Sequence, residues 1–140
     1  MDTKLKLLIV TFAILIGGCK SAREVVYKPA GFNIEFGKSG GFTNVPTDYL
    51  INGDRKVFKH ETDKYIYLKT ISKQELTNLK QIFEKSEFST LVLNEPGNMT
   101  YFLKVKDSSY ENDVQWNDQS DAERVKLIYY QLVELIKSKP

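Results

Sequence analysis

Residues 99–116, MTYFLKVKDSSYENDVQW, contain the pattern that decides the fold. In the first half of this stretch an apolar side chain recurs at every second position, which is the period of a half-buried β-strand: Met99, Tyr101, Leu103 and Val105. A polar turn at residues 107–111 follows, and Val114 and Trp116 then resume the alternation. The stretch therefore predicts an antiparallel hairpin with one face directed into a core.

The sequence upstream of this hairpin predicts further strands, which either alternate in polarity or are rich in aromatic and β-branched side chains. A glycine cluster at residues 37–41 and the turn Asn52-Gly53-Asp54 interrupt the series. The predicted strands cover residues 32–36, 49–51, 55–60 and 65–71.

Two other segments have a helical period. Residues 72–75, Ser-Lys-Gln-Glu, match a capping box, in which the serine hydroxyl and the glutamate carboxylate bind free backbone amides at a helix start. Residues 120–123, Ser-Asp-Ala-Glu, match the same motif. Apolar residues follow each motif at helical spacing: Leu76, Leu79, Ile82 and Phe83 in the first segment, and Val125, Ile128, Leu132, Leu135 and Ile136 in the second.

The order of these elements predicts the fold class. Strands, a helix, two more strands and a final helix are typical of an α+β domain, with an antiparallel β-sheet and two helices packed on one face. We expect residues 32–140 to form this single domain. Residues 20–31 have no sustained period and contain Pro29 and Gly31, so they are interpreted as a tether.

The N-terminal segment predicts export and lipid attachment. Residues 4–19, KLKLLIVTFAILIGGC, combine two lysines, a short apolar run and small residues before a cysteine. The run is too short to span a bilayer, and its ending resembles a bacterial lipobox. The resemblance implies removal of residues 1–18 as a signal peptide and acylation of Cys19 with chains such as palmitate. A cleaved secretory signal and an uncleaved anchor are the alternatives.

The composition argues against several functional classes. The formal net charge is only +2, which gives no electrostatic reason to expect a nucleic acid partner. Cys19 is the only cysteine and His60 the only histidine, so no zinc-binding pair or thiol nucleophile is expected in the domain. We expect a protein that is not an enzyme and that has no cofactor and no metal.

The candidate recognition site is the glycine-rich turn Gly40-Gly41-Phe42-Thr43. Two glycines before an aromatic residue leave two possibilities for Phe42. It either folds back under the sheet edge as an apolar plug, or it is exposed as an anchor for a binding partner. The sequence leaves both possibilities open.

The mature domain also resembles the emfourin family. The resemblance lies in Ile34-Glu35-Phe36, in Ser39-Gly40-Gly41-Phe42-Thr43, in the strand at residues 100–105 and in the Asn117-Asp118 turn before the last helix. Emfourins are protein inhibitors of thermolysin-type (M4) zinc metalloproteases such as protealysin. The resemblance implies a protease-binding module held at a membrane of the bacterial cell envelope through the lipid on Cys19, in a leaflet that the sequence does not specify.

An envelope lipoprotein that binds a small ligand or another protein is the alternative hypothesis. Its basis is the supply of aromatic side chains along the predicted strands, where one face of the sheet could remain uncovered: Tyr65, Tyr67, Tyr101, Phe102, Tyr110 and Trp116.

Overall fold

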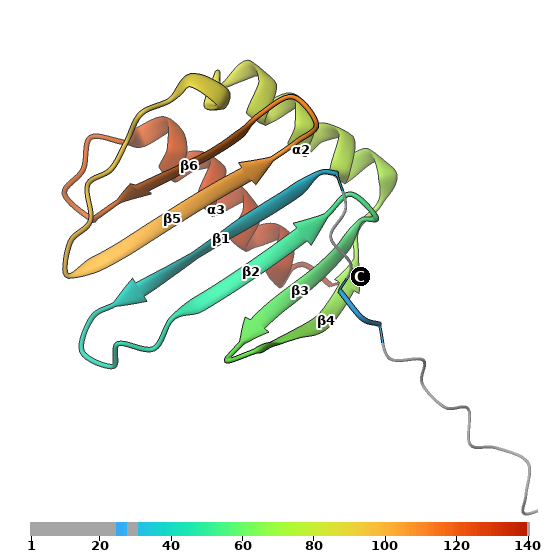
Figure 1. Ribbon diagram of the computed structural model, residues 1–140, viewed down its shortest axis with the longest axis horizontal. Coiled ribbons are helices and arrows are strands. Elements are labelled where there is room, and N and C mark those ends of the chain that lie inside the picture. The colour runs from blue at the N-terminus through green and yellow to red at the C-terminus, as the bar shows by residue number, and fades with distance from the viewer. Residues whose placement is uncertain (1–24, 28–30, 140) are drawn as a thin grey trace, which may run out of the picture.

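The computed structural model describes residues 25–27 and 31–139. It contains a six-stranded antiparallel sheet with two helices over one face (Figure 1). The α+β fold predicted from the sequence is therefore confirmed. The predicted signal peptide, residues 1–18, and the predicted lipidation site, Cys19, lie outside the described residues.

The strands and helices follow one another as the periodicity predicts. The elements are β1 (Asn33–Gly40), β2 (Thr47–Asn52), β3 (Lys56–Glu61), β4 (Lys64–Thr70), α2 (Lys73–Lys85), the short 3-10 helix η2 (Phe88–Thr90), β5 (Met99–Lys106), β6 (Glu111–Trp116) and α3 (Glu123–Lys137). Their spatial order in the sheet is β4-β3-β2-β1-β5-β6. The predicted hairpin at residues 99–116 therefore forms β5 and β6 and extends the sheet from β1 (Figure 1).

The central strand β1 organises the hydrophobic core. Ile34 lies between Ile51 of β2 and Val105 of β5, and all three side chains are buried. Successive strand residues point to opposite faces, so these residues share the face that the helices cover. Helices α2 and α3 bury their apolar stripes there, with Leu79 and Leu132 among the contributing side chains.

The described helices α2 and α3 pack against the sheet and contribute to one hydrophobic core. Their buried residues belong to the same cluster as the inner face of the sheet, which runs from Phe32 to Leu132 along the chain. None of the helices in the described part of the chain is long and apolar enough to cross a membrane.

Helix α2 begins at the predicted capping box. The Glu75 amide donates a hydrogen bond of 3.1 Å to the Ser72 hydroxyl oxygen. The Ser72 amide donates one of 2.6 Å to the Glu75 carboxylate. Hydrogen bonding from Ser72 lowers the pKa of the Glu75 carboxyl, since it favours the charged form. This prediction is confirmed, because every atom of the motif lies within one turn of the chain.

The capping box predicted at residues 120–123 is wrong. Helix α3 begins after Ala122, which has no side-chain cap. The Ser120 hydroxyl instead accepts a hydrogen bond of 3.0 Å from the Asn117 amide in the preceding turn. The Lys126 ammonium group donates to the Ser120 carbonyl at 2.7 Å. The serine is therefore used in the turn that leads out of β6, and it is not available to the first amides of the helix.

The C-terminal end of α3 is attached to the edge strand β4. The Lys69 ammonium group donates hydrogen bonds to the carbonyls of Leu135 and Ser138, the latter at 2.7 Å. The last carbonyls of a helix lack partners within the helix and carry partial negative charge, so a cation there is favourable. Lys69 therefore holds α3 against the outer part of the sheet.

Replacing Ser72 by alanine should lower the free energy of unfolding by about 1 kcal/mol, because the Glu75 amide would lose its partner at the helix start. Urea denaturation followed by circular dichroism measures the change. Ser89→Ala is the matched control, since Ser89 is exposed within η2. We expect the control to stay within about 0.5 kcal/mol of the wild type. Equal losses in both variants would contradict the cap.

Tyr129 on α3 lies in an aromatic cluster beneath the sheet. Its ring packs edge to face on Phe36, Tyr101 and Trp116, with ring centroids 6.1, 5.5 and 5.5 Å away. Burial raises the pKa of Tyr129 to about 12 from an ordinary value of 10.0. Since the unfolded chain releases this proton at lower pH than the folded domain, ionisation favours unfolding.

The domain should therefore lose stability as the pH rises between 10.0 and about 12, and should show no such loss from Tyr129 below that window. Denaturation midpoints measured across the alkaline range test this expectation. Tyr129→Phe should flatten the pH dependence in this window, because the ring is kept and the ionising hydroxyl is removed. An unchanged pH profile in that variant would assign the alkaline loss to other groups.

Candidate functional site

Two glycines shape the base of the connection between β1 and β2. Gly40 and Gly41 have positive φ angles of 94° and 73°. The Gly41 amide donates a hydrogen bond of 2.8 Å to the Asn98 carbonyl. A Cβ atom at Gly40 would overlap with that same carbonyl oxygen. Only glycine fits this position, because it tolerates both the positive φ and the close approach of the other backbone.

Phe42 is fully exposed at the tip of this connection, and Val45 in the same loop is also exposed. Figure 1 shows the loop projecting beyond the end of the sheet between β1 and β2. The plug interpretation is therefore wrong for Phe42, which does not fold back under the sheet edge. Thr43, the fourth residue of the predicted site, is also exposed. Gly40 is the last residue of β1, and Gly41, Phe42 and Thr43 form the turn that follows it.

The face of the sheet opposite the helices carries a second cluster. Phe58 of β3 follows the core residue Val57, so it points away from the helices, and yet it is fully buried. Tyr27, from the segment before β1, packs edge to face on Phe58 with ring centroids 5.7 Å apart. It also contacts Tyr65 of β4, at 4.4 Å between centroids. Tyr27 therefore covers part of the face that the helices leave open.

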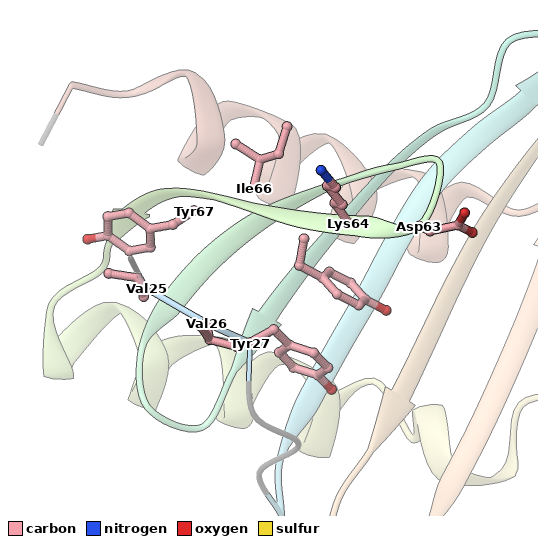
Figure 2. A pocket seen from close by; sticks show the side chains of 8 residues that line it. Val25, Val26, Tyr27, Asp63, Lys64, Ile66 and Tyr67 are labelled. Carbon is pink, nitrogen blue, oxygen red and sulfur yellow. The ribbon is translucent and has the colours of Figure 1, made fainter. Parts of the chain in front are cut away.

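A shallow hollow of about 510 Å³ lies between β4 and residues 25–27, which we call the Tyr27 segment. Figure 2 shows the side chains that line it, which come from these two stretches of the chain: Val25, Val26, Tyr27, Asp63, Lys64, Tyr65, Ile66 and Tyr67. Its lining is aromatic and aliphatic apart from two charged residues, Asp63 and Lys64.

The pKa values of Tyr27 and Tyr65 are raised by their surroundings. Burial raises the pKa of Tyr65, and the nearby carboxylates of Glu35 and Asp48 add to the shift. Burial likewise raises the pKa of Tyr27. Both hydroxyls therefore stay protonated at neutral pH, so they can donate hydrogen bonds but cannot act as anionic bases.

His60 lies near the end of β3, and its ring stacks on Tyr65 with centroids 4.8 Å apart. The nearest oxygen of the Asp48 carboxylate is 3.7 Å from Nδ1. Within residues 25–27 and 31–139, no group of three or more His, Cys, Asp or Glu side chains is arranged to hold a metal ion.

The aromatic residues of the alternative hypothesis do not form one site. Tyr65 and Tyr67 line the hollow, but Tyr101 and Trp116 stack on each other beneath α3. Tyr110 lies with Phe32 and Lys80 in a different depression. The sequence did not single out Tyr27. The available signal was the apolar run Val25-Val26-Tyr27 inside an otherwise polar tether.

Comparison with models of known protein families gives no match for this chain, and comparison with curated protein sequences gives none either. The resemblance to emfourins therefore stays a hypothesis based on the residues given above.

Replacing Tyr27 by alanine should lower the free energy of unfolding by about 2 kcal/mol, because Phe58 would be exposed and the ring packing on Phe58 and Tyr65 removed. Thermal and urea unfolding of the chain from residue 19 onward measure this change. Val26→Ala is the matched control in the same segment, since the Val26 side chain is largely exposed. We expect the control to change stability by less than about 0.5 kcal/mol. Equal stability of both variants would show that the Tyr27 segment is not part of the packed domain.

Proposed function

We propose that this chain is a non-enzymatic recognition module of the bacterial envelope, anchored through lipid on Cys19, which binds a thermolysin-type metalloprotease with the turn Gly40-Gly41-Phe42-Thr43. The observation that carries the proposal is the full exposure of Phe42 at the tip of a loop with a fixed base. An exposed phenylalanine on a constrained loop is unfavourable in water unless a partner covers it.

The loop geometry supports a binding role on energetic grounds. The Gly41 to Asn98 hydrogen bond and the close approach at Gly40 restrict the loop before any partner arrives. A restricted loop loses less conformational entropy on association, which favours affinity. Phe42 supplies the large apolar side chain that typically dominates an interface, and exposed Val45 extends the apolar surface.

A metalloprotease cleft suits such a loop. Catalytic zinc sites keep one coordination position open for water or substrate, and side-chain pockets adjoin that position. In the proposed complex Phe42 or Thr43 occupies a side-chain pocket, and the domain behind the loop blocks access of substrate. The domain contributes no catalytic group and no cofactor to this arrangement.

A small-ligand function is the second candidate, and the hollow beside Tyr27 is the observation that favours it. Aromatic walls with a few polar groups at the rim are common in ligand sites. The hollow lies on the open face near the β4 edge, and the Phe42 loop connects β1 and β2. The two candidate functions can therefore be tested with separate substitutions.

The chain from residue 20 to 140, purified without lipid, should inhibit a thermolysin-like protease at micromolar concentration. Phe42→Ala should weaken this inhibition by about tenfold or more, since aromatic anchors at interface centres contribute the largest single terms. Hydrolysis of a quenched fluorescent peptide measures residual activity. Val92→Ala is the matched control, because Val92 is 92% exposed on a different loop, and it should inhibit like the wild type.

Absence of inhibition across several thermolysin-like enzymes would remove the protease proposal. Equal inhibition by Phe42→Ala and the wild type would keep an inhibitor but reject the glycine turn as its contact. Mass spectrometry of the protein purified from cells tests the anchor independently. The proposal requires a start at Cys19 with acyl chains attached, and a free thiol or an uncleaved leader would contradict it.

A further inference from the structure

The two outer edges of the sheet differ in how far other described segments of the chain cover them. The outer edge of β6 is covered by the segment before β5, since the Gln115 amide donates to the Leu93 carbonyl at 3.0 Å and the Glu95 amide donates to the Gln115 carbonyl at 2.9 Å. Strand β4 is the opposite edge, and among the described strands only β3 pairs with it. Figure 1 shows β4 at the outside of the sheet.

Apolar side chains gather at the open edge. Ile66, Tyr67 and Leu68 are consecutive in β4 and are 44%, 37% and 41% exposed. Val26, at 61%, lines the same hollow as Tyr67, and Figure 2 shows Ile66 on the opposite side of β4 from Val26. We call these four residues the β4 edge patch. Proteins commonly protect an open edge with charged side chains, so three consecutive apolar residues at this position call for a covering surface.

The position of the patch relative to Cys19 indicates what covers it. Val25 follows Cys19 by six residues in the sequence. A fully extended chain spans about 3.5 Å per residue, so Val25 is at most about 20 Å from Cys19. Tyr27 attaches this segment to Phe58 and Tyr65 on the open face. A lipid on Cys19 would therefore keep the β4 edge patch close to the bilayer.

We propose that the β4 edge patch rests on the membrane interface when the protein is anchored. This inference rests on the proposed function in one respect, the lipid at Cys19. The chemistry fits an interface, because tyrosine combines an apolar ring with a polar hydroxyl and is favoured at headgroup level. Lys64 at the start of β4 is exposed, and its long aliphatic stem allows the ammonium group to remain among the headgroups.

Contact with the surface of a membrane explains the patch better than binding of a ligand within the hollow. Ligand sites direct their apolar side chains inward and enclose most of the ligand. Here the aliphatic members Val26 and Ile66 are among the more exposed side chains of the lining. Contacts of this kind are shallow and become effective when an anchor already holds the protein at the surface.

The arrangement has a consequence for the Phe42 loop. The loop and the turn between β3 and β4 lie at the same end of the sheet (Figure 1). Neighbouring strands are about 4.8 Å apart, so β1 and β2 lie only about 10–15 Å from the β4 edge. A domain resting on the β4 edge patch would present Phe42 close to the membrane surface, to partners that are themselves at the membrane.

Tryptophan fluorescence in an anchored sample tests the proposal. The chain from Cys19 to Pro140 is coupled through Cys19, its only cysteine, to a maleimide phosphatidylethanolamine in phosphatidylcholine vesicles. Leu68→Trp places a reporter in the β4 edge patch. Leu127→Trp is the matched control, because Leu127 is 61% exposed on α3, in the layer on the other face of the sheet. Native Trp116 is buried and provides the same background in both variants.

Brominated phosphatidylcholine should quench the Leu68→Trp reporter about threefold more than the Leu127→Trp reporter, because quenching requires the ring to enter the interface. Adding Ile66→Glu to the Leu68→Trp variant should remove the difference. Equal quenching of the two reporters, or none, would overturn the proposal. Chemical coupling makes the result independent of natural lipidation, so failure here is distinguishable from a cellular protein that lacks acyl chains.

Discussion

The fold depends on the burial of one face of the central strand β1 between two antiparallel neighbours. Ile34 and Phe36 are fully buried, and each is flanked by side chains from β2 and β5 on the same face. Both helices cover this face, so the hydrophobic contribution of the core is concentrated along one strand. Glycine at position 37 allows β1 to lie close to the Thr47 carbonyl and the Phe102 ring.

The second face of the sheet is covered by neither α2 nor α3, and this asymmetry shapes the proposed functional surfaces. Phe58 is shielded there by the rings of Tyr27, Tyr65 and Tyr67. The adjoining β4 edge remains partly apolar and open, while the β6 edge is covered. The open β4 edge lies next to residues 25–27, which follow the proposed lipid on Cys19 in the sequence. Attachment of this side of the domain to a membrane would leave the β1–β2 loop accessible.

Local motifs and longer-range contacts differ in how well the sequence predicts them. The capping box at Ser72 was predictable because its donor and acceptor atoms lie within four residues. The same motif at Ser120 failed because the hydroxyl had a competing partner, Asn117, three residues upstream. Tyr27 was missed because its contacts with Phe58 and Tyr65 join distant parts of the chain. The spacing of apolar residues shows which face of a helix or strand is buried, but not which other segment covers that face.

The sequence by itself determined the α+β class, the order of strands and helices and the buried stripes, because polarity alternates with a period set by the backbone. It also determined that a turn with two glycines precedes Phe42. Only the tertiary structure decided that Phe42 faces solvent, that Tyr27 closes part of the open face and that β4 is the outer strand opposite β6. These outcomes depend on contacts between segments far apart in the chain, and burial at each position is fixed only when all of them pack together.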